Sequence, residues 1–459
     1  MYQIDFNKPI WIHFIGIGGI SMSGLAEVLL GRGFQVSGSD SRKSDLTEKL
    51  KADGARIFYG QRAANIVDGI DAVVYTAAVH EDNEEFQAAR EKGLPLLTRA
   101  ELLGQMMRNY PTAVAIAGTH GKTTTTSMVT EVLLSAGCDP TISVGGMLDS
   151  IGGNIRVGKS GLFVTEACEY TNSFLSFFPT VGVILNICED HLDFFKDIAD
   201  IRRSFRLFAE RIPEGGLLII DSGIPDYQEI TAGLSCRVRS VGTRPEDDFC
   251  ARDITYDCHA NPSFLLKEKG GEELAASLSV PGEHNVWNAL AAAAVGREVG
   301  LSLAEIRDGL QNFTGTHRRF ELKGNLGGIT IVDDYAHHPD EIRATLLAAK
   351  KCEADRIVCV FQPHTYTRTK ALMEEFADAL SLADSVVLAE IYPARETDNL
   401  GISSKNLAER LSARGTEVHY FPSFDEIENF LLENSVNGDL LITMGAGDIV
   451  IVGEKLLGQ

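Results

Sequence analysis

The chain has 459 residues, 44% of them hydrophobic and 23% charged, which is typical of a globular protein with about two to four domains. Its formal net charge of −22 argues against nucleic acid and against an anionic membrane surface as partners. The eight cysteines form no C-x-x-C pair, which favours free thiols in a reducing compartment over a zinc site. The first residues lack the features of a secretory signal, and no stretch is long enough to span a membrane, so we expect a cytoplasmic protein.

The first segment begins with a strand, a glycine turn, a helix and a second strand, predicted at Trp11–Ile15, Gly16–Gly19, Ser21–Leu30 and Gln35–Asp40. This βαβ unit nearly matches a dinucleotide-binding fingerprint, although Ser21 replaces its third glycine. Asp40 lies about where a ribose-binding acid is expected. Such a turn suits a nicotinamide dinucleotide or another nucleotide diphosphate such as a UDP-sugar. Further strand–helix alternation predicts a Rossmann-like domain over residues 1–110.

A second glycine turn follows the predicted strand Ala113–Ala117. We call its residues Gly118–Gly121 the phosphate turn, because backbone amides there can face a phosphate at the N-terminus of the next helix. Lys122 supplies a positive charge, and Thr123 or Thr124 supplies a hydroxyl for Mg²⁺. The pattern is not the standard phosphate loop, since Ile116 occupies its first glycine position. It nevertheless predicts ATP binding, and a second nucleotide site argues against a dehydrogenase.

Two further apolar strands carry polar side chains at their ends. Leu162–Thr165 precedes Glu166, and Val181–Asn186 precedes a cluster of Glu189, Asp190, His191 and Asp193. Ligands of open α/β sheets bind at the carboxyl ends of the strands, so we expect Glu166 and His191 to converge on Lys122 as Mg²⁺ ligands.

A helix predicted from about Asn285 carries side-chain amides at its start. Asn285 and Asn288 suit the edge of adenine, and a plain helix cap at Asn285 is an equally good interpretation. Arg318 and Arg319 follow at a predicted domain junction, where either can bind a phosphate or remain solvated.

The last segment is again α/β, with polar clusters after its strands. The strand Ile329–Val332 is followed by DDYAHHP, and Pro339 is expected to start a helix. The strand Arg356–Phe361 is followed by QPHTYTRT, and the strand Ser385–Glu390 by IYPARET. These strand ends predict a site for a small amino acid.

These motifs together resemble the Mur ligases, the ATP-dependent amino-acid-adding enzymes of peptidoglycan synthesis. The resemblance covers essentially the whole chain and rests on HFIGIGG, GTHGKTTT, EACE, NICEDHLD, PGEHNVWNA, HRRFE, DDYAHHP, FQPHTYTR and MGAGDI. It implies three domains: residues 1–110 for the UDP-sugar, 111–316 for ATP and Mg²⁺, and 317–459 for the amino acid. Cys168 stands where relatives commonly have an acid, which favours Glu166 as the metal ligand.

The resemblance implies that L-alanine is joined to the lactyl carboxylate of UDP-N-acetylmuramate through an acyl phosphate. The catalytic residues implied are Lys122, Glu166, His191 and Arg368, and the metal ligands are Thr123, Glu166 and His191. The ATP-binding residues implied are Gly118, Thr119, His120, Gly121, Lys122, Thr123, Thr124, Asn285, Asn288, Arg319 and Asp334. Those for the UDP-sugar are Gly16, Gly18, Gly19, Ser39, Asp40 and His337, and those for the amino acid are His364, Tyr366, Arg368 and Arg395.

Three points stay open at this stage. A ligase that attaches a recycled tripeptide to the same UDP-sugar is the alternative within the family, and a non-catalytic nucleotide sensor is the alternative of another class. The general base is His337, His338 or His364 without a choice among them. We expect a monomer or a homodimer, with hinges near residues 110 and 316 that close the domains around the substrates.

Overall fold

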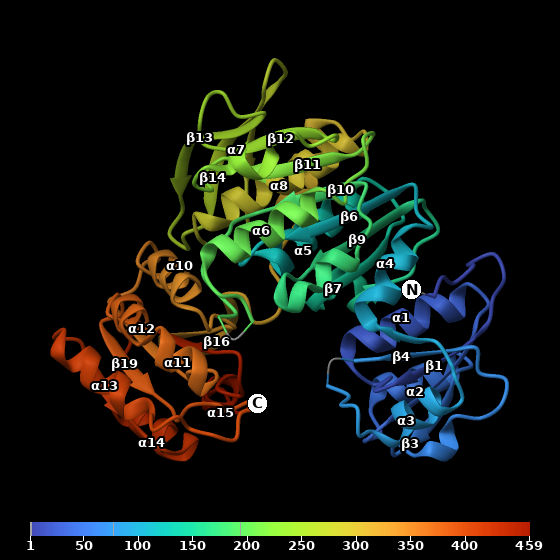
Figure 1. The fold of residues 1–459 in the computed structure, drawn as a ribbon. Coiled ribbons are helices and arrows are strands. Elements are labelled where there is room, and N and C mark those ends of the chain that lie inside the picture. The colour runs from blue at the N-terminus through green and yellow to red at the C-terminus, as the bar shows by residue number, and fades with distance from the viewer. Residues whose placement is uncertain (1, 77, 193) are drawn as a thin grey trace. The chain divides into compact units, whose positions relative to one another are not determined.

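The computed structural model describes residues 2–76, 78–192 and 194–459. The chain forms two compact units. The first contains Met1–Cys188, Ile198–Val241 and Ala291–Ile306, and the second contains Glu189–Asp197, Gly242–Leu290 and Arg307–Gln459. Three sheets, each accompanied by helices, confirm the predicted α/β class (Figure 1). The domain boundaries at residues 110 and 316 stay a prediction.

The N-terminal sheet, blue in Figure 1, has the parallel order β3-β2-β1-β4-β5. Its strands are β1 (Trp11–Ile15), β2 (Gln35–Asp40), β3 (Arg56–Tyr59), β4 (Ala72–Tyr75) and β5 (Leu96–Thr98). Its helices are α1 (Ile20–Gly31), α2 (Asp45–Ala52), α3 (Glu84–Glu91) and α4 (Arg99–Met107), with a 3₁₀ turn η1 (Ala63–Asn65). The strand order reverses between β1 and β4, so the glycine turn after β1 lies at a topological switch point, where such sheets bind ligands.

Side-chain caps fix where several helices of this domain begin. Asn83 accepts hydrogen bonds from two backbone amides of the first turn of α3. Thr98 and Glu101 form a capping box at the start of α4. A cap of this kind typically stabilises a helix by about 1 kcal/mol and sets the direction of its first side chains.

The first unit also contains strands in the order β12-β11-β10-β6-β9-β7-β8. They are β6 (Thr112–Ala117), β7 (Thr141–Leu148), β8 (Gly153–Arg156), β9 (Leu162–Ala167), β10 (Val181–Ile184), β11 (Leu217–Asp221) and β12 (Arg237–Gly242). The helical segments are α5 (Lys122–Ser135), η2 (Asp149–Ile151), η3 (Tyr170–Ser176), α6 (Ile198–Ala209) and α7 (Tyr227–Thr231). β6 is parallel to both β9 and β10, which explains why its residues are almost all apolar and buried.

The second unit contains an antiparallel meander of β13 (Phe249–Tyr256), β14 (Pro262–Glu268) and β15 (Glu273–Ser277). Its main sheet has the order β16-β17-β21-β18-β19-β20. These strands are β16 (Glu321–Leu326), β17 (Ile329–Asp334), β18 (Arg356–Phe361), β19 (Ser385–Leu388), β20 (Glu417–Tyr420) and β21 (Asp439–Met444). All pair in parallel except β16 with β17.

The remaining helices follow in chain order. They are α8 (His284–Glu298), α9 (Leu303–Asn312), α10 (Pro339–Ala349), α11 (Tyr366–Ala371), α12 (Met373–Leu380), α13 (Ser404–Ala413), α14 (Phe424–Asn434) and α15 (Val450–Leu456). Pro339 is the first residue of α10, as predicted, because its fixed φ suits that position. Within the described part of the chain, no helix is long and apolar enough to cross a membrane.

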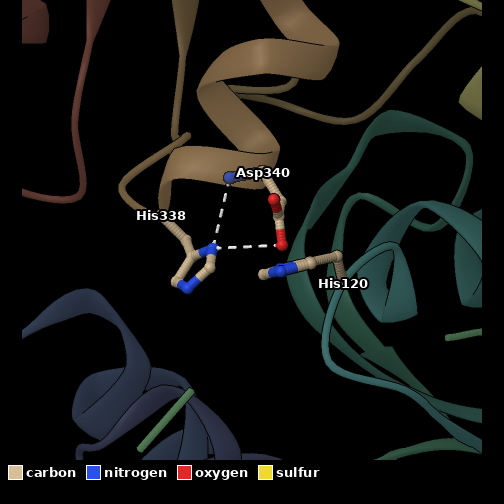
Figure 2. Close-up of side chains that lie close together, drawn as sticks. All are labelled: His120, His338 and Asp340. Atoms are coloured by element: carbon tan, nitrogen blue, oxygen red, sulfur yellow. Dashed lines mark hydrogen bonds and ion pairs between the residues drawn. The ribbon is translucent and has the colours of Figure 1, made fainter. Parts of the chain in front are cut away.

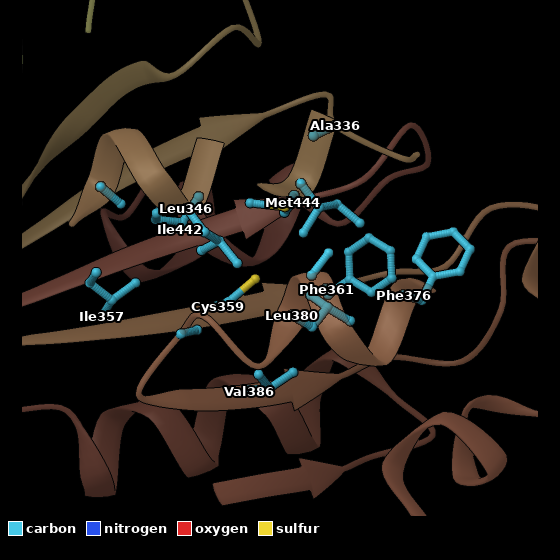
Figure 3. Packing of buried hydrophobic residues seen from close by; sticks show 14 of the residues in the cluster. Ala336, Leu346, Ile357, Cys359, Phe361, Phe376, Leu380, Val386, Ile442 and Met444 are labelled. Atoms are coloured by element: carbon cyan, nitrogen blue, oxygen red, sulfur yellow. The ribbon is translucent and has the colours of Figure 1, made fainter. Parts of the chain in front are cut away.

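The core of the C-terminal sheet is apolar on both faces. Cys359 and Phe361 of β18 belong to one cluster, while Val358 and Val360 belong to another, because successive strand residues point to opposite faces. Figure 3 shows the first cluster, in which the rings of Phe361 and Phe376 lie 5.8 Å apart between centroids. The continuous apolar run of β18 therefore reflects burial on both sides.

Four predicted strand ends and one predicted cap are wrong. The strands predicted to end at Asn186 and Glu390 end at Ile184 and Leu388. Glu166 lies inside β9, which extends to Ala167, and Asp334 lies inside β17. Both acids belong to the strands because each is paired with a residue of the neighbouring strand, Glu166 with Ile116 and Asp334 with Met444. Asn285 is not the cap of α8, since the helix already begins at His284.

Replacing Phe376 by Ala tests the C-terminal core. The ring is fully buried, so Phe376→Ala is expected to lower the free energy of unfolding by about 3–5 kcal/mol through lost burial and a residual cavity. Urea unfolding followed by circular dichroism measures the change. The matched control is Leu432→Ala on α14, whose side chain is 64% exposed, with an expected change below about 0.5 kcal/mol. Equal effects of the two variants would contradict the assignment of this core.

Candidate active site

The phosphate turn connects β6 to α5 with a left-handed backbone at Gly118 (φ 144°) and Gly121 (φ 83°). A side chain at Gly118 would meet the Cβ of Leu185 at 2.9 Å, so the close approach also requires glycine. Asn186 supports the turn from the end of β10. Its backbone oxygen accepts a hydrogen bond from Thr119 N at 3.2 Å, and its side-chain oxygen accepts one from His120 N at 2.8 Å.

Lys122 is the first residue of α5, and its ammonium is held from several sides. It donates to the carbonyl oxygens of Gly118 at 2.5 Å and Thr119 at 3.0 Å, and it forms an ion pair with Glu169 at 3.0 Å. Burial alone would lower the pKa of Lys122, but Glu169, Cys168 and Glu166 outweigh this effect and raise it. The side chain therefore remains positively charged at the phosphate turn.

Sequence reasoning singled out Glu166 and missed the ion pair that Glu169 makes. Glu166 lies beside Ile116 in the β6–β9 register, and it accepts a hydrogen bond from Gly145 N at 2.5 Å. The Glu169 carboxylate is almost fully buried against Lys122. A signal was present, since the EACE motif offers two acids three residues apart. Burial raises the pKa of the Cys168 thiol between them, so this group stays neutral.

Thr123 and Thr124 lie in the first turn of α5 and are half-buried. Their hydroxyls make no hydrogen bond among the residues that the structure describes, so both remain accessible to a ligand. Oxygen ligands are those that Mg²⁺ prefers. Thr123 and Glu166 fit that preference. His191 belongs to the second unit, so the metal set with His191 stays a prediction, and Asp193 lies outside the described residues.

The glycine turn of the N-terminal domain is held by the end of β2. Gly16 and Ile17 both donate backbone hydrogen bonds to the Ser39 carbonyl at 2.9 Å, and Gly18 N donates to Asp40 Oδ2 at 2.9 Å. The structure therefore brings together Gly16, Gly18, Gly19, Ser39 and Asp40. Asp40 is the last residue of β2, and its carboxylate contacts the backbone of this glycine turn.

A buried acid that sequence reasoning missed lies beneath this strand end. Glu85 of α3 is fully buried and accepts hydrogen bonds from Ser39 Oγ and Asn65 Nδ2, each at 2.5 Å. His13 Nε2 lies 3.6 Å from the same carboxylate. These contacts fix the Ser39 side chain, whose backbone holds the glycine turn.

In the second unit, Asp190 pairs with Arg368 at 3.3 Å. Burial alone would raise the pKa of Asp190, but Arg368, His191 and His338 lower it to about 2. Figure 2 shows His338 beside Asp340 at the start of α10, where His338 Nδ1 accepts a hydrogen bond from Asp340 N at 3.3 Å. The other ring nitrogen of His338 lies 3.0 Å from the Glu189 carbonyl oxygen. The Glu189–His191 segment is thus tied to α10 and α11.

The two arginines of HRRFE have different surroundings. Arg318 forms an ion pair with Asp333 at 2.9 Å and donates to the carbonyl oxygens of Gly445 and Gly447, so it joins the strand ends. Arg319 lies 3.9 Å from Glu341. This weaker pairing leaves Arg319 better placed than Arg318 to meet a phosphate.

Asp334 holds a turn in the same region. Its carboxylate accepts hydrogen bonds from Phe320 N at 2.8 Å and Ala336 N at 2.7 Å. Burial nevertheless raises its pKa to about 6 against the opposing effect of Arg319. The contact of Asp334 with ATP stays a prediction.

The residues predicted for the amino acid fall into two groups. His364 stacks on Tyr392 at 5.5 Å between ring centroids, and His337 lies 5.8 Å from His364 by the same measure. Tyr366 N donates to Glu396 at the start of α11. Arg395 is exposed and has no ion pair among the described residues, so the structure does not join it to this cluster.

The amides predicted for adenine contact each other. Asn288 Nδ2 donates to Asn285 Oδ1 at 3.0 Å, and Asn285 Nδ2 donates to the Pro281 carbonyl at 2.7 Å. Their contact with a nucleotide stays a prediction. His284, one residue earlier, is exposed at the start of α8.

The geometry defines a nucleotide-binding α/β protein, with a lysine-bearing phosphate turn and a second glycine turn. Family models match three successive parts of the chain: "Mur ligase family, catalytic domain" at residues 11–111, "Mur ligase middle domain" at 116–296, and "Mur ligase, glutamate ligase domain" at 318–447. The chain belongs to the Mur ligase family, a family of ATP-dependent enzymes.

Relatives match along the full length. A UDP-N-acetylmuramate–L-alanine ligase of Agathobacter rectalis is 60% identical over 457 residues, which covers 100% of both chains. A crystal structure of UDP-N-acetylmuramate–alanine ligase from Thermotoga maritima is 32% identical with a TM-score of 0.80 and covers 98% of both chains. A murein peptide ligase structure from Psychrobacter arcticus is 26% identical with a TM-score of 0.72 and the same coverage.

The half-buried His337 predicts a dependence of stability on pH. Its pKa is about 4, lowered from 6.5 mainly by burial. Unfolding frees the imidazole to take a proton, so its stabilising contribution is complete above pH 6.5 and is lost as the pH falls toward 4. We expect His337→Gln to lose less stability than the wild type across this range, by on the order of 1–3 kcal/mol.

Urea unfolding at a series of pH values measures this difference. Asp334 acts in the opposite direction, because its raised pKa favours the folded state at low pH, but it is present in both proteins and cancels. The control is His259→Gln, which replaces an exposed histidine and should follow the wild-type curve. Parallel curves for His337→Gln and the wild type would contradict the prediction.

Proposed function

We propose that this chain joins L-alanine to the lactyl carboxylate of UDP-N-acetylmuramate and converts ATP to ADP and phosphate. The observation that carries the proposal is the 60% identity, over the full length of both chains, to a UDP-N-acetylmuramate–L-alanine ligase. The two glycine turns support it, because they offer separate sites for a nucleotide sugar and a nucleoside triphosphate. The reaction belongs to peptidoglycan precursor synthesis, and its nucleotide substrates place it in the cytoplasm.

The first step is phosphoryl transfer from ATP to the lactyl carboxylate, which gives an acyl phosphate and ADP. Lys122 is positioned for this step, since its ammonium stays charged at the phosphate turn. A positive charge there stabilises negative charge on the transferring phosphoryl group. Before ATP binds, the Glu169 carboxylate neutralises the charge of Lys122. The phosphate oxygens of ATP then compete with Glu169 for the ammonium.

Thr123, Glu166 and His191 are the residues we propose for Mg²⁺, with Thr123 and Glu166 as oxygen ligands. When bound, Mg²⁺ supplies Lewis-acid neutralisation of the phosphate charges. Gly118, Thr119, His120, Gly121 and Thr124 surround the triphosphate in this proposal, and Asn285, Asn288, Arg319 and Asp334 contribute from the second unit.

The second step is attack of the alanine amine on the acyl phosphate carbonyl, with release of phosphate. The amine must lose a proton first, and a neutral imidazole can accept it. His337 is neutral at physiological pH, since burial lowers its pKa to about 4, and the pKa of His364 is also lowered, chiefly by burial. We assign the amino-acid site to His364, Tyr366 and Arg368, and we retain His337 for the sugar nucleotide.

A coupled ADP-release assay tests this function. The purified chain, ATP and UDP-N-acetylmuramate are combined with L-alanine, glycine, L-serine or the recycled tripeptide in separate reactions. Release of ADP that depends on L-alanine supports the proposal. Turnover with the tripeptide alone would replace the proposal by the recycling activity, and nucleotide binding without any ADP release would replace it by a sensor role.

The Lys122→Ala variant tests the phosphoryl-transfer step. We expect acyl-phosphate formation, trapped as a hydroxamate, to fall at least about 100-fold, because the charge that stabilises the transferring group is removed. Binding of UDP-N-acetylmuramate, measured by calorimetry, should persist. Lys159→Ala, which replaces an exposed lysine of the same unit, is the matched control. Normal turnover of Lys122→Ala would refute the role of this lysine.

A further inference from the structure

Arg99 is a half-buried cation that the activity described above does not use. It is the first residue of α4, and the Thr98–Glu101 capping box fixes the backbone at this point. Glu101 Oε2 accepts hydrogen bonds from Thr98 N at 2.7 Å and from Thr98 Oγ1 at 3.0 Å. The direction in which the Arg99 side chain leaves the helix is therefore set by the local sequence.

The half-buried guanidinium of Arg99 makes few hydrogen bonds to other residues of the protein. Nη1 donates a hydrogen bond to Ser21 Oγ at 2.9 Å. Among the described residues, the guanidinium makes no other hydrogen bond, and no carboxylate lies within ion-pairing distance. Arg318 and Arg368, by contrast, each pair with an aspartate. A guanidinium has five N–H donors, and burying its charge without an anion is costly. The geometry calls for an oxyanion that the protein itself does not supply.

The surroundings of Arg99 indicate which anion fits. Ser21 lies in the first turn of α1, directly after the glycine turn of the N-terminal domain. On the other side, burial lowers the pKa of Arg99, while Cys168 and Glu166 act in the opposite direction, as they also do on Lys122. The start of α1, where Ser21 contacts Arg99, lies against β7 and β8, and Asn154 Nδ2 of β8 donates to the Ile20 carbonyl at 3.5 Å. Because β7 pairs with β9, this places Arg99 on the side of the glycine turn that faces the strand carrying Glu166.

We propose that Arg99 binds the lactyl carboxylate of the sugar nucleotide and directs it toward the phosphate turn. This inference rests on the proposed function, because the carboxylate is the reacting group of that substrate. The diphosphate of the same molecule belongs at the glycine turn, whereas its carboxylate has to reach the phosphoryl group that Lys122 faces. The planar fork of arginine suits a carboxylate, and the contact makes Arg99 a specificity-determining residue.

Binding measurements with three nucleotides test the inference. UDP-N-acetylmuramate carries both the diphosphate and the carboxylate, UDP-N-acetylglucosamine lacks only the lactyl group, and UDP lacks the sugar as well. Calorimetry with the wild type, Arg99→Met and Arg99→Lys gives the affinity for each ligand. We expect Arg99→Met to bind UDP-N-acetylmuramate at least about 10-fold more weakly, to keep its affinity for the other two within about twofold, and Arg99→Lys to be intermediate.

Controls separate binding from folding. Arg90→Met removes an exposed arginine of the same domain and should leave all three affinities unchanged. Ser21→Ala removes the protein partner of Arg99 and should affect UDP-N-acetylmuramate less than Arg99→Met does. Thermal unfolding is measured for each variant. If Arg99→Met does not fold, the preference of Arg99→Lys for UDP-N-acetylmuramate over UDP-N-acetylglucosamine decides.

Two outcomes would overturn the inference. Equal losses for all three nucleotides would place Arg99 at the diphosphate, and unchanged affinities would make it a structural residue. The KM for ATP should also stay unchanged in Arg99→Met. Failure of the proposed function is distinguished from these results, because it appears as absent L-alanine-dependent ADP release by the wild type, whereas the affinities are measured without turnover.

Discussion

The ion pair between Lys122 and Glu169 is the interaction around which the candidate site is arranged. Burial of an ammonium is unfavourable, and the nearby carboxylate compensates for it, so the charge is kept at the N-terminus of α5. The same lysine donates hydrogen bonds to the carbonyl oxygens of Gly118 and Thr119, which fixes the backbone of the phosphate turn. Under the proposed function, a triphosphate would bring negative charge to a place where the positive charge is already fixed, which would reduce the reorganisation that catalysis requires.

Both glycine turns depend on a polar residue at the end of a neighbouring strand. Asn186 at the end of β10 holds the backbone of Thr119 and His120, and the Ser39 carbonyl at the end of β2 holds Gly16 and Ile17. Asn186 and Ser39 both lie at the ends of buried strands, so the backbone of each glycine turn is held in a fixed position. Glu85 adds a layer beneath Ser39, where a fully buried carboxylate is satisfied by hydrogen bonds from a hydroxyl and an amide.

The C-terminal sheet places its polar residues by the same principle. Arg318 joins β17 to the loop after β21 through Asp333 and two carbonyl oxygens. Among the described residues, the adjacent Arg319 has only a longer ion pair, with Glu341. His337 and His364 stand together at the ends of β17 and β18, with low pKa values that keep both imidazoles neutral. Rigid strands with apolar faces thus carry a cluster of groups suited to accept a proton.

The sequence by itself determined the α/β class, most strands and helices, and the positions of both glycine turns. It could do so because these features depend on local periodicity, on glycine conformation and on the polar residues that follow apolar strands. It also singled out Lys122 and Glu166 as candidates, since both lie within a few residues of a recognisable strand. Only the tertiary structure decided the partners: Glu169 for Lys122, Glu85 for Ser39, Asn186 for the phosphate turn, and Ser21 for Arg99. Those contacts join residues far apart in the chain, and their energies depend on distances and burial that no local pattern encodes.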